Sequence, residues 1–339
     1  MHTQFLKPNK KTLDLACKLI KEGEIVAIPT ETVYGLAGDA TNQQAIEKIF
    51  KAKGRPVDNP LIVHISNLDM LSKIAREINE DAKKLANTFW PGPLTIIVPK
   101  TDYVCNVVTA GLDSVGIRMP ANQTTLKLIE KSNTPLAAPS ANLSGKPSPT
   151  TALDVFDDLN GKIPLIIDAE DCDAGVESTV ISVINKIPII LRPGVITKEE
   201  IEYVLDKKVK LAKEITNEVP YDAKVLSPGM KYKHYSPNAE VIIIKGSLKK
   251  FIEYINKNTN NNCYAMCFDG EENIIPISAI SYGKQDDAKS QAHNLFKILR
   301  SLDKQKAKTI FVRCPKSSGI ALAVYNRLIR SAGFKIIEL

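Results

Sequence analysis

The sequence predicts an α/β protein with two domains, the first built on a mixed sheet and the second on a smaller set of alternating strands and helices. Short apolar runs typical of buried strands alternate with longer stretches whose apolar residues recur at helical spacing. The spacing of these runs is irregular in the first two thirds of the chain, which favours a mixed sheet over strict βαβ repetition. A chain of 339 residues also exceeds what one hydrophobic core usually supports.

The first domain is expected to cover residues 1–205. Thr12 to Glu22 has an apolar stripe at helical spacing, and Gly23 suits the end of that helix. Ile25 to Ile28 is predicted as the first buried strand. Further helices are expected at 43–51, 81–89, 124–131, 151–159 and 197–205, and further strands at 61–65, 94–98, 115–118, 136–138, 165–168 and 179–183.

The segment 206–237 is polar and charged and ends in turn-forming sequences, so it is predicted as a linker. Residues 238–339 form the second domain, in which strands at 241–244, 263–268 and 309–312 alternate with helices at 248–255, 288–302 and 319–332. This alternation predicts a small Rossmann-like α/β unit. The unit contains no G-x-G-x-x-G sequence, so its topology does not imply a dinucleotide.

Composition and charge narrow the class of protein. The net charge of +7 favours anionic ligands or nucleic acid without choosing between them. The six cysteines include no C-x-x-C pair, so neither a zinc site nor redox chemistry is expected, and a reducing cytoplasmic setting is the default. No apolar run approaches the length needed to span a membrane, so no membrane association is expected.

Polar loops adjoin several of the predicted strands. Sheets of α/β proteins place ligands at strand ends, so loops of this kind are candidates for one convergent site. Each loop alone is weak evidence, and for Pro29 to Leu36 the alternative is a hydrogen-bonded turn. The loops are Pro29 to Leu36, the residues around Arg118, Ser140-Ala141-Asn142 with the following Ser144 to Thr150, Glu177-Ser178-Thr179, and Arg192-Pro193-Gly194.

A basic loop, Lys53-Gly54-Arg55-Pro56, precedes Asn59-Pro60 and is stiffened by its prolines. Arginine offers a planar fork for phosphate and lysine a point charge beside it. The chain has no Walker-type glycine loop, so any nucleotide must be held by side chains such as these. The alternative is a solvated helix end. His64 follows in an apolar strand. Its position is equally consistent with a core histidine whose hydrogen bonds are satisfied within the protein and with a histidine that binds a ligand.

The end of the predicted linker, Ser227 to Pro237, is rich in aromatic and basic residues. A plain spacer rarely needs two tyrosines, a histidine and two lysines within a few residues. Such a segment, which includes His234 and Tyr235, could fold over a nucleotide as a lid. Packing between the two domains is the alternative explanation.

Taken in order, these motifs resemble the YrdC-type domain of threonylcarbamoyl-AMP synthases. The motifs that carry the resemblance are Pro29 to Leu36, Lys53 to Pro56, Ser140 to Asn142, Ser178-Thr179 and Arg192 to Gly194. The linker and the small second domain resemble the long, two-domain form of that enzyme. The resemblance implies a YrdC-like twisted mixed sheet. It also implies a nucleotidyltransferase that joins L-threonine, bicarbonate or CO2, and ATP into L-threonylcarbamoyl-AMP and pyrophosphate.

The resemblance also implies roles for single residues. Lys53 and Arg55 are similar to the catalytic, phosphate-binding pair, with Asn59 nearby. The threonine-binding positions would be Thr32, His64, Arg118, Ser140 and Ser178. The remaining ATP-binding positions would be Asn142, Ser148 and Arg192, with His234 and Tyr235 as lid residues over the nucleotide.

Cofactor and partners follow from the same resemblance. Mg²⁺ is expected on the phosphates of ATP, because magnesium usually takes its ligands from the nucleotide, and no protein metal cage is visible in the sequence. Downstream proteins would transfer the threonylcarbamoyl group to the adenosine beside the anticodon of certain tRNAs, so contact with tRNA is at most indirect. Two other classes remain open: a non-catalytic module that binds double-stranded RNA or tRNA, and a carbamoyl transferase for a metalloenzyme precursor.

Overall fold

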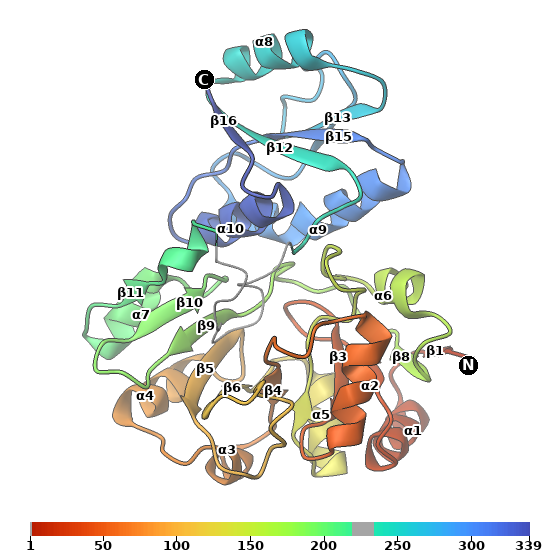
Figure 1. The fold of residues 1–339 in the computed structure, drawn as a ribbon, viewed down its shortest axis with the longest axis vertical. Coiled ribbons are helices and arrows are strands. Elements are labelled where there is room, and N and C mark those ends of the chain that lie inside the picture. The colour runs from red at the N-terminus through yellow and green to blue at the C-terminus, as the bar shows by residue number, and fades with distance from the viewer. Residues whose placement is uncertain (1, 219–233) are drawn as a thin grey trace.

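Two lobes, each built around one β-sheet, make up the computed structural model, which describes residues 2–218 and 234–339 (Figure 1). The large sheet belongs to the amino-terminal part of the chain and the small sheet to the carboxy-terminal part. Helices flank both sheets, and Figure 1 shows α9 and α10 between the small sheet and the amino-terminal lobe. The predicted α/β class, with a mixed sheet and a second smaller unit, is confirmed.

The elements of the amino-terminal lobe follow the predicted order closely. They are β1 (Gln4–Leu6), α1 (Lys10–Lys21), β2 (Val26–Ile28), β3 (Gly35–Asp39), α2 (Gln43–Lys53), β4 (Ile62–His64), α3 (Leu68–Ile74), α4 (Glu80–Phe89), β5 (Leu94–Pro99), β6 (Ser114–Arg118), α5 (Gln123–Ser132), β7 (Leu136–Ala137), α6 (Ala152–Leu159), β8 (Leu165–Ile167), β9 (Thr179–Ser182), β10 (Ile189–Arg192), α7 (Lys198–Leu205) and β11 (Lys210–Leu211).

The large sheet is mixed. Its order over the described residues is β1-β8-β2-β3-β7-β4-β6-β5-β9-β10-β11. β3 runs antiparallel to both β2 and β7, whereas β4 and β6 are parallel neighbours. The register of that parallel pair sets His64 directly beside Arg118. Two side chains that the sequence separates by more than fifty positions therefore share one edge of the sheet.

Local sequence explains where the helices begin and end. Asparagine side chains accept backbone N–H groups at the starts of α1, α2, α3, α4 and α5, which satisfies donors that have no partner within the helix. α2 ends at Gly54, whose φ of +60° is a left-handed conformation that glycine adopts without a steric penalty. The chain turns sharply there, and Arg55 leaves the helix in a new direction.

The carboxy-terminal lobe is a parallel sheet covered on both faces. Its elements are β12 (Glu240–Lys245), α8 (Leu248–Asn258), β13 (Cys263–Cys267), β14 (Ala279–Ser281), α9 (Ala288–Lys304), β15 (Thr309–Arg313), α10 (Ala321–Ser331) and β16 (Ile336–Glu338). The strand order is β14-β13-β15-β12-β16, and every described pair is parallel. Strands buried on both faces have the continuous apolar character seen in Val241 to Ile244.

The two lobes share buried surface. The core beneath α9 and α10 includes Val33 and Val176 of the amino-terminal lobe, together with Tyr235. In the segment that we expect to link the domains, β11 adds a parallel strand to β10, and a short 3-10 helix follows at Lys213–Ile215. Residues 227–233, the first part of the predicted lid motif, lie outside the described residues.

Two features bear on the expected class of protein. No helix within the described ranges is long and apolar enough to cross a bilayer. All six cysteines are free thiols. Cys263 and Cys267 lie on the same strand and are both buried in one core cluster, where they pack as small apolar residues.

Candidate active site

A pocket with about 590 Å³ of empty space opens where the polar strand-end loops meet. The pocket lies next to the contact between the carboxy-terminal lobe and the amino-terminal lobe. Nine of the side chains that the sequence places in the site line it. These are Thr32, Arg55, His64, Arg118, Ser140, Ser178, Arg192, His234 and Tyr235.

Arg118, at the end of β6, is held on three sides. It donates from Nη1 to Thr32 Oγ1 at 2.8 Å and from Nε to the Gly92 carbonyl at 3.2 Å. Its Nη2 pairs with Glu31 Oε1 at 2.6 Å. Arginine is planar and donates in a fixed fork, so these partners fix its orientation. The guanidinium therefore faces the pocket as an oriented positive charge that already has a carboxylate beside it.

His64 stands beside Arg118 and is buried. Burial and the adjacent guanidinium lower the pKa of His64 to about 3, so its imidazole is neutral at physiological pH. Its Nδ1 has no hydrogen-bond partner among the described residues. A neutral, buried ring nitrogen in a pocket is a polar group that a ligand can satisfy.

Arg192, at the end of β10, also lines the pocket. It donates from Nε to the Ser178 carbonyl at 3.0 Å and from Nη2 to Ser178 Oγ at 3.1 Å. Ser178 Oγ also lies 2.8 Å from Thr95 Oγ1. The β9 and β10 ends are thus tied together before any ligand binds, and Arg192 presents its charge from a rigid position.

Lys53 and Arg55 lie in different places, although the sequence groups them. Arg55 lines the pocket and donates from Nη2 to the Asn59 and Pro60 carbonyls, both at 3.3 Å. Lys53 lies behind the wall, where its Nζ donates to the Ser140 carbonyl and, at 2.6 Å, to the Asn142 carbonyl. Burial and the charge of Arg55 lower the pKa of Lys53 well below its ordinary value. Lys53 holds the pocket loop in this structure, and Arg55 faces the cavity.

Three further predicted residues lie near the pocket without lining it: Asn59, Asn142 and Ser148. Asn142 stabilises its own loop, because its Nδ2 donates to the Leu143 and Lys146 carbonyls. Ser148 donates from Oγ to Glu177 Oε1 at 2.5 Å. Asn59 is buried, and its side chain has no hydrogen-bond partner among the described residues.

His234 and Tyr235 are the described end of the predicted lid. Burial and the charge of Arg55 lower the pKa of His234 to about 3, and its Nε2 has no described hydrogen-bond partner. Tyr235 stacks on Phe296 of α9, with ring centroids 5.3 Å apart. The next residue, Ser236, donates from its backbone to the Gly145 carbonyl at 2.8 Å. His234 and Tyr235 of this short segment both line the pocket.

The charge of the pocket suits an anionic ligand. Among its described lining residues are three arginines and one carboxylate, Glu177, which already accepts from Ser148 and pairs with Arg327. No group of three or more His, Cys, Asp or Glu side chains in the described ranges could hold a metal ion. The protein residues described here therefore do not fit a magnesium site of their own.

Sequence reasoning missed some residues of this site. Thr30, whose Oγ1 lies 2.8 Å from Thr32 Oγ1, belongs to the Pro29 to Leu36 motif and could have been found there. Glu177 was seen only as part of a loop, although its carboxylate lines the pocket. Arg327 lies 150 residues beyond its partner Glu177 and carries no local signal.

Comparison with known proteins covers nearly the whole chain. Residues 18–194 match a family model described as "Telomere recombination", and residues 196–333 match one described as "Threonylcarbamoyl-AMP synthase, C-terminal domain". A threonylcarbamoyl-AMP synthase of Pyrococcus abyssi is 44% identical over 330 residues, covering 96% of this chain and 95% of the relative. One of Bacillus subtilis is 43% identical over 340 residues, covering 99% and 97%.

A solved structure extends the similarity to three dimensions. A crystal structure of P. abyssi Sua5 complexed with L-threonine matches with a TM-score of 0.91 at 41% identity, covering 100% of this chain and 99% of that chain. Both lobes and the segment between them take part in these matches. The chain therefore belongs to the threonylcarbamoyl-AMP synthase family.

Proposed function

We propose that this chain joins L-threonine, bicarbonate or CO2, and ATP into L-threonylcarbamoyl-AMP and pyrophosphate in the pocket described above. One observation carries the assignment to this pocket: nine side chains predicted from separate sequence motifs line a single cavity. Membership of the synthase family, over nearly the full length of both chains, supports the reaction. The site residues and their roles are our proposal.

The threonine half of the site is assigned to Thr32, His64 and Arg118, with Ser140 and Ser178 beside them. The related P. abyssi structure complexed with L-threonine supports a threonine site in this fold. Arg118 would bind the carboxylate of threonine, which must compete with Glu31 for the same guanidinium. The neutral ring of His64 would hydrogen-bond the substrate. A site that bonds the threonine hydroxyl rejects analogues without it, by roughly 4 kcal/mol or more in favourable cases.

The nucleotide half is assigned to Arg55 and Arg192, which face the cavity, and to His234 and Tyr235, which cover it. Lys53, Asn59, Asn142 and Ser148 complete the proposed ATP set from the surrounding wall. Mg²⁺ would enter on the phosphates of ATP, because the described side chains offer it no cage.

The reaction needs alignment and charge neutralisation more than a covalent nucleophile. The neutral amine of threonine adds to CO2 with loss of a proton, or condenses with bicarbonate with loss of water, to give a carbamate. A carbamate oxygen then attacks the α-phosphorus of ATP, and pyrophosphate leaves in line. Arg55 and Arg192 are fixed by backbone and side-chain oxygens before substrate binds, so they can stabilise the developing charge without rearranging.

The wider setting is also a proposal. We divide the chain into a catalytic domain of residues 1–205, a linker with a lid at 206–237 and a carboxy-terminal domain of residues 238–339. Six free thiols support a reducing compartment such as the cytoplasm. The unstable product would pass to downstream proteins that transfer the threonylcarbamoyl group to tRNA.

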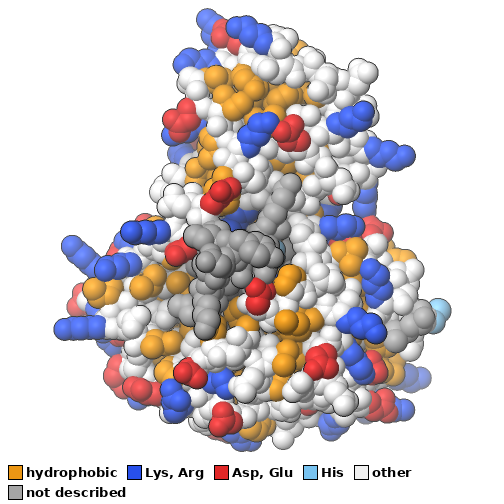
Figure 2. Space-filling view, in the orientation of Figure 1, with side chains coloured by type: hydrophobic (Ala, Val, Ile, Leu, Met, Phe, Trp, Pro, Cys, Tyr) orange, Lys and Arg blue, Asp and Glu red, His pale blue; other side chains and the backbone are white. Residues whose placement is uncertain are grey.

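Pyrophosphate release from ATP tests the assignment. We expect release to require both threonine and bicarbonate, and to fall when either is withheld. Release that is indifferent to both would overturn the proposed reaction. The rival hypothesis, a non-catalytic RNA-binding module, predicts salt-sensitive RNA affinity without turnover. Figure 2 gives it no support on the face shown, where lysine and arginine side chains are interspersed with aspartate and glutamate over both lobes.

A further inference from the structure

Arg327 of α10 is the largest fully buried side chain of the described chain, with 0% of its surface exposed. A charged side chain is almost never buried so completely unless it is paired and hydrogen-bonded. Arg327 belongs to the carboxy-terminal lobe, yet nearly all of its partners belong to the amino-terminal lobe or line the pocket.

The guanidinium of Arg327 contacts three parts of the pocket wall. Its Nε donates to Glu177 Oε2 at 2.9 Å, and its Nη2 donates to the Glu177 carbonyl at 3.3 Å. Its Nη1 donates to the carbonyl of Pro193, the residue after Arg192, at 2.7 Å. Its carbon Cζ lies 5.6 Å from the ring centroid of Tyr235. One side chain thus links the β9 start, the β10 end and the closing segment.

Glu177 connects Arg327 to Ser148. One carboxylate oxygen accepts from Arg327, and the other accepts from Ser148 Oγ at 2.5 Å. Burial alone would raise the pKa of Glu177, but Arg327, Arg192 and Ser148 together hold it below its usual value. The carboxylate therefore stays charged and keeps both partners. Without Arg327, a buried carboxylate would face Ser148 with much of its compensating charge removed.

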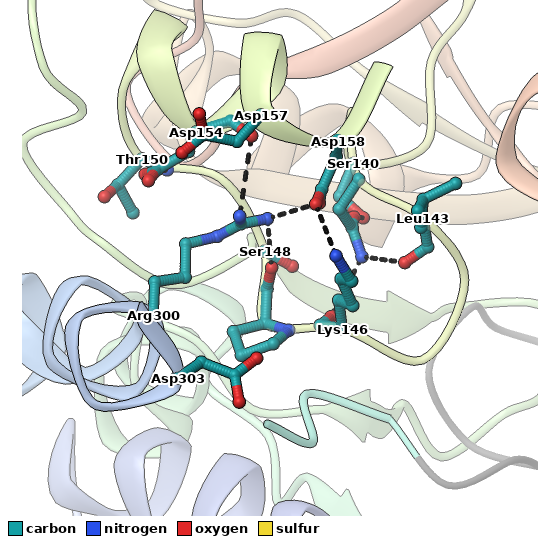
Figure 3. A network of polar contacts seen from close by, with 12 residues as sticks. Ser140, Leu143, Lys146, Ser148, Thr150, Asp154, Asp157, Asp158, Arg300 and Asp303 are labelled. Carbon is teal, nitrogen blue, oxygen red and sulfur yellow. Dashed lines mark hydrogen bonds and ion pairs between the residues drawn. The ribbon is translucent and has the colours of Figure 1, made fainter. Parts of the chain in front are cut away.

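A second arginine of the carboxy-terminal lobe fixes the other side of the same loop (Figure 3). Arg300 of α9 donates to the Pro147 carbonyl at 2.7 Å and to Asp158 Oδ2 at 2.8 Å. Lys146 donates to the other oxygen of Asp158 at 2.9 Å. Ser148 is thus held on both sides by contacts that begin in the carboxy-terminal lobe. The lobe does not merely adjoin the pocket but determines where part of its wall lies.

We propose that Arg327 is a positioning residue of the active site, supplied by the carboxy-terminal lobe, which fixes the nucleotide side of the pocket through Glu177. This inference rests on the proposed function, in which Ser148, Arg192 and Tyr235 belong to the ATP half. Within the described residues, Arg327 makes no hydrogen bond to a side chain of the threonine half, although one of these residues, Ser178, directly follows Glu177. Its loss should therefore weaken ATP binding more than threonine binding.

The test replaces Arg327 by methionine, which keeps much of the volume and removes the fork. Arg327→Lys restores the charge but only one donor group, so it should recover part of the affinity. Because Arg327→Met leaves the buried Glu177 carboxylate without its arginine partner, which destabilises the fold, the double variant Arg327→Met with Glu177→Gln removes that buried charge as well. These three variants are compared with the wild-type full-length chain.

Arg313→Met provides a matched control. Arg313 is also a buried arginine of the carboxy-terminal lobe, 5% exposed, and it pairs with Glu271 through Nε at 3.0 Å. Its other described contacts, to the Gly246 carbonyl and to the rings of Phe251 and Phe268, stay within that lobe. Arg313→Met should lower the melting temperature as Arg327→Met does, but it should leave the pocket unchanged.

Two measurements separate positioning from general stability. The first is equilibrium binding of a non-hydrolysable ATP analogue, which needs no turnover. The second is the KM for ATP and for threonine in pyrophosphate release, below the melting temperature of every variant. We expect Arg327→Met, or the double variant if the single one does not fold, to weaken analogue binding by about tenfold or more. Threonine KM should change less, and Arg313→Met should bind the analogue as wild type does.

Wild-type analogue affinity in a folded Arg327→Met or double variant would overturn the inference, and so would equal weakening in Arg313→Met. Equal increases in both KM values would also contradict it, because they indicate a loss of structure throughout the site. Failure of the proposed function would give a different result. The wild-type chain would then release no pyrophosphate in response to threonine and bicarbonate, whatever the Arg327 variants bind.

Discussion

Lys53 and Arg55 are two positions apart, but their surroundings differ and so should the effects of replacing them. Arg55→Ala removes a cavity-facing charge, so we expect at least about a hundredfold loss of turnover, as for other groups that stabilise transition-state charge. Lys53→Ala should also lose most turnover. It leaves the Ser140 and Asn142 carbonyls without their donor, so the free energy of unfolding should fall by about 1–3 kcal/mol.

Pyrophosphate release and urea denaturation measure the two effects. Wild-type rates in either variant would contradict the assignment of this loop to the site. An unchanged unfolding free energy in Lys53→Ala would instead contradict its structural role. Gly54 makes the difference between the two residues possible, because its left-handed turn separates the direction of Arg55 from that of the helix.

The buried histidine His64 predicts a pH dependence of stability. Its pKa is about 3 in the folded chain and 6.5 when unperturbed, so the unfolded chain binds a proton that the folded chain does not. Stability is therefore fully present above pH 6.5 and is lost as the pH falls toward 3, by up to about 1.4 kcal/mol per pH unit. His64→Gln should make this slope shallower in denaturation experiments run across that range.

The pKa of His234 is lowered in the same direction, so this residue should contribute a similar pH dependence of stability. His64→Gln should therefore remove only part of the total pH dependence. A slope that His64→Gln does not alter would mean that the imidazole titrates normally in the folded chain.

At the residue scale, sequence motifs predicted which side chains gather but not which way they face. Arg118, His64 and Arg192 could be found because each ends a recognisable apolar strand. Lys53 was grouped with Arg55 because charge alone does not show that a lysine is buried on two carbonyl groups. Arg327 could not be found at all, since its pairing with Glu177 depends on how two lobes pack.

At the element scale, Gly175 is where the loop before β9 meets α9. A Cβ added there would lie 2.4 Å from the Ala292 carbonyl oxygen and 2.4 Å from His293 Cα, so the helix would have to move. Gly175→Ala should therefore destabilise the contact between the lobes and shift Glu177, two residues further on. We expect a lower melting temperature together with a higher KM for ATP.

Gly270→Ala is the matched control, because Gly270 also has a positive φ, of +86°, but a Cβ there would meet nothing within 4 Å. Both substitutions carry the strain of a left-handed residue, of about 1 kcal/mol or more. Gly175→Ala alone carries the clash as well. Equal effects of the two substitutions would show that the clash is relieved without cost.

Most elements could be predicted from periodicity, although the helix α3 was missed, and the short strands that were missed in the amino-terminal lobe have a common physical reason. β3 has the sequence Gly-Leu-Ala-Gly-Asp, whose composition favours a loop, and it becomes a strand only because β2 and β7 pair with it. β1 and β11 have three and two residues and pair with β8 and β10. Strands this short are determined by their partners and not by their own side chains.

At the scale of the whole molecule, the shared core predicts that the two lobes unfold together. Trp90, the single tryptophan of the sequence, lies in the amino-terminal lobe and donates to the Leu94 carbonyl at 2.7 Å. Its fluorescence reports on that lobe, whereas far-ultraviolet circular dichroism reports on both. We expect the two signals to give one common transition in urea for the wild-type chain.

Arg300→Met should weaken this coupling. It removes charged hydrogen bonds between α9 and the loop at Pro147, at a cost of about 2 kcal/mol to the unfolding free energy. We expect the two signals to move to lower urea, and to separate if the lobes then unfold one at a time. Lys316→Met, which breaks an exposed ion pair with Asp286, should change neither. Unchanged transitions in Arg300→Met would contradict the coupling.

The burial of Arg327 against Glu177 also has a consequence for how the protein is made. A ribosome adds the two residues 150 positions apart, on the order of ten seconds or more at typical rates of synthesis. The large sheet can form during that interval, but the wall behind Ser148 stays unfinished until α10 has left the exit tunnel. A chain released early would carry every motif of the amino-terminal lobe and still lack a complete nucleotide pocket. Completion of the wall at Ser148 and Glu177 thus depends on a helix made 150 positions later.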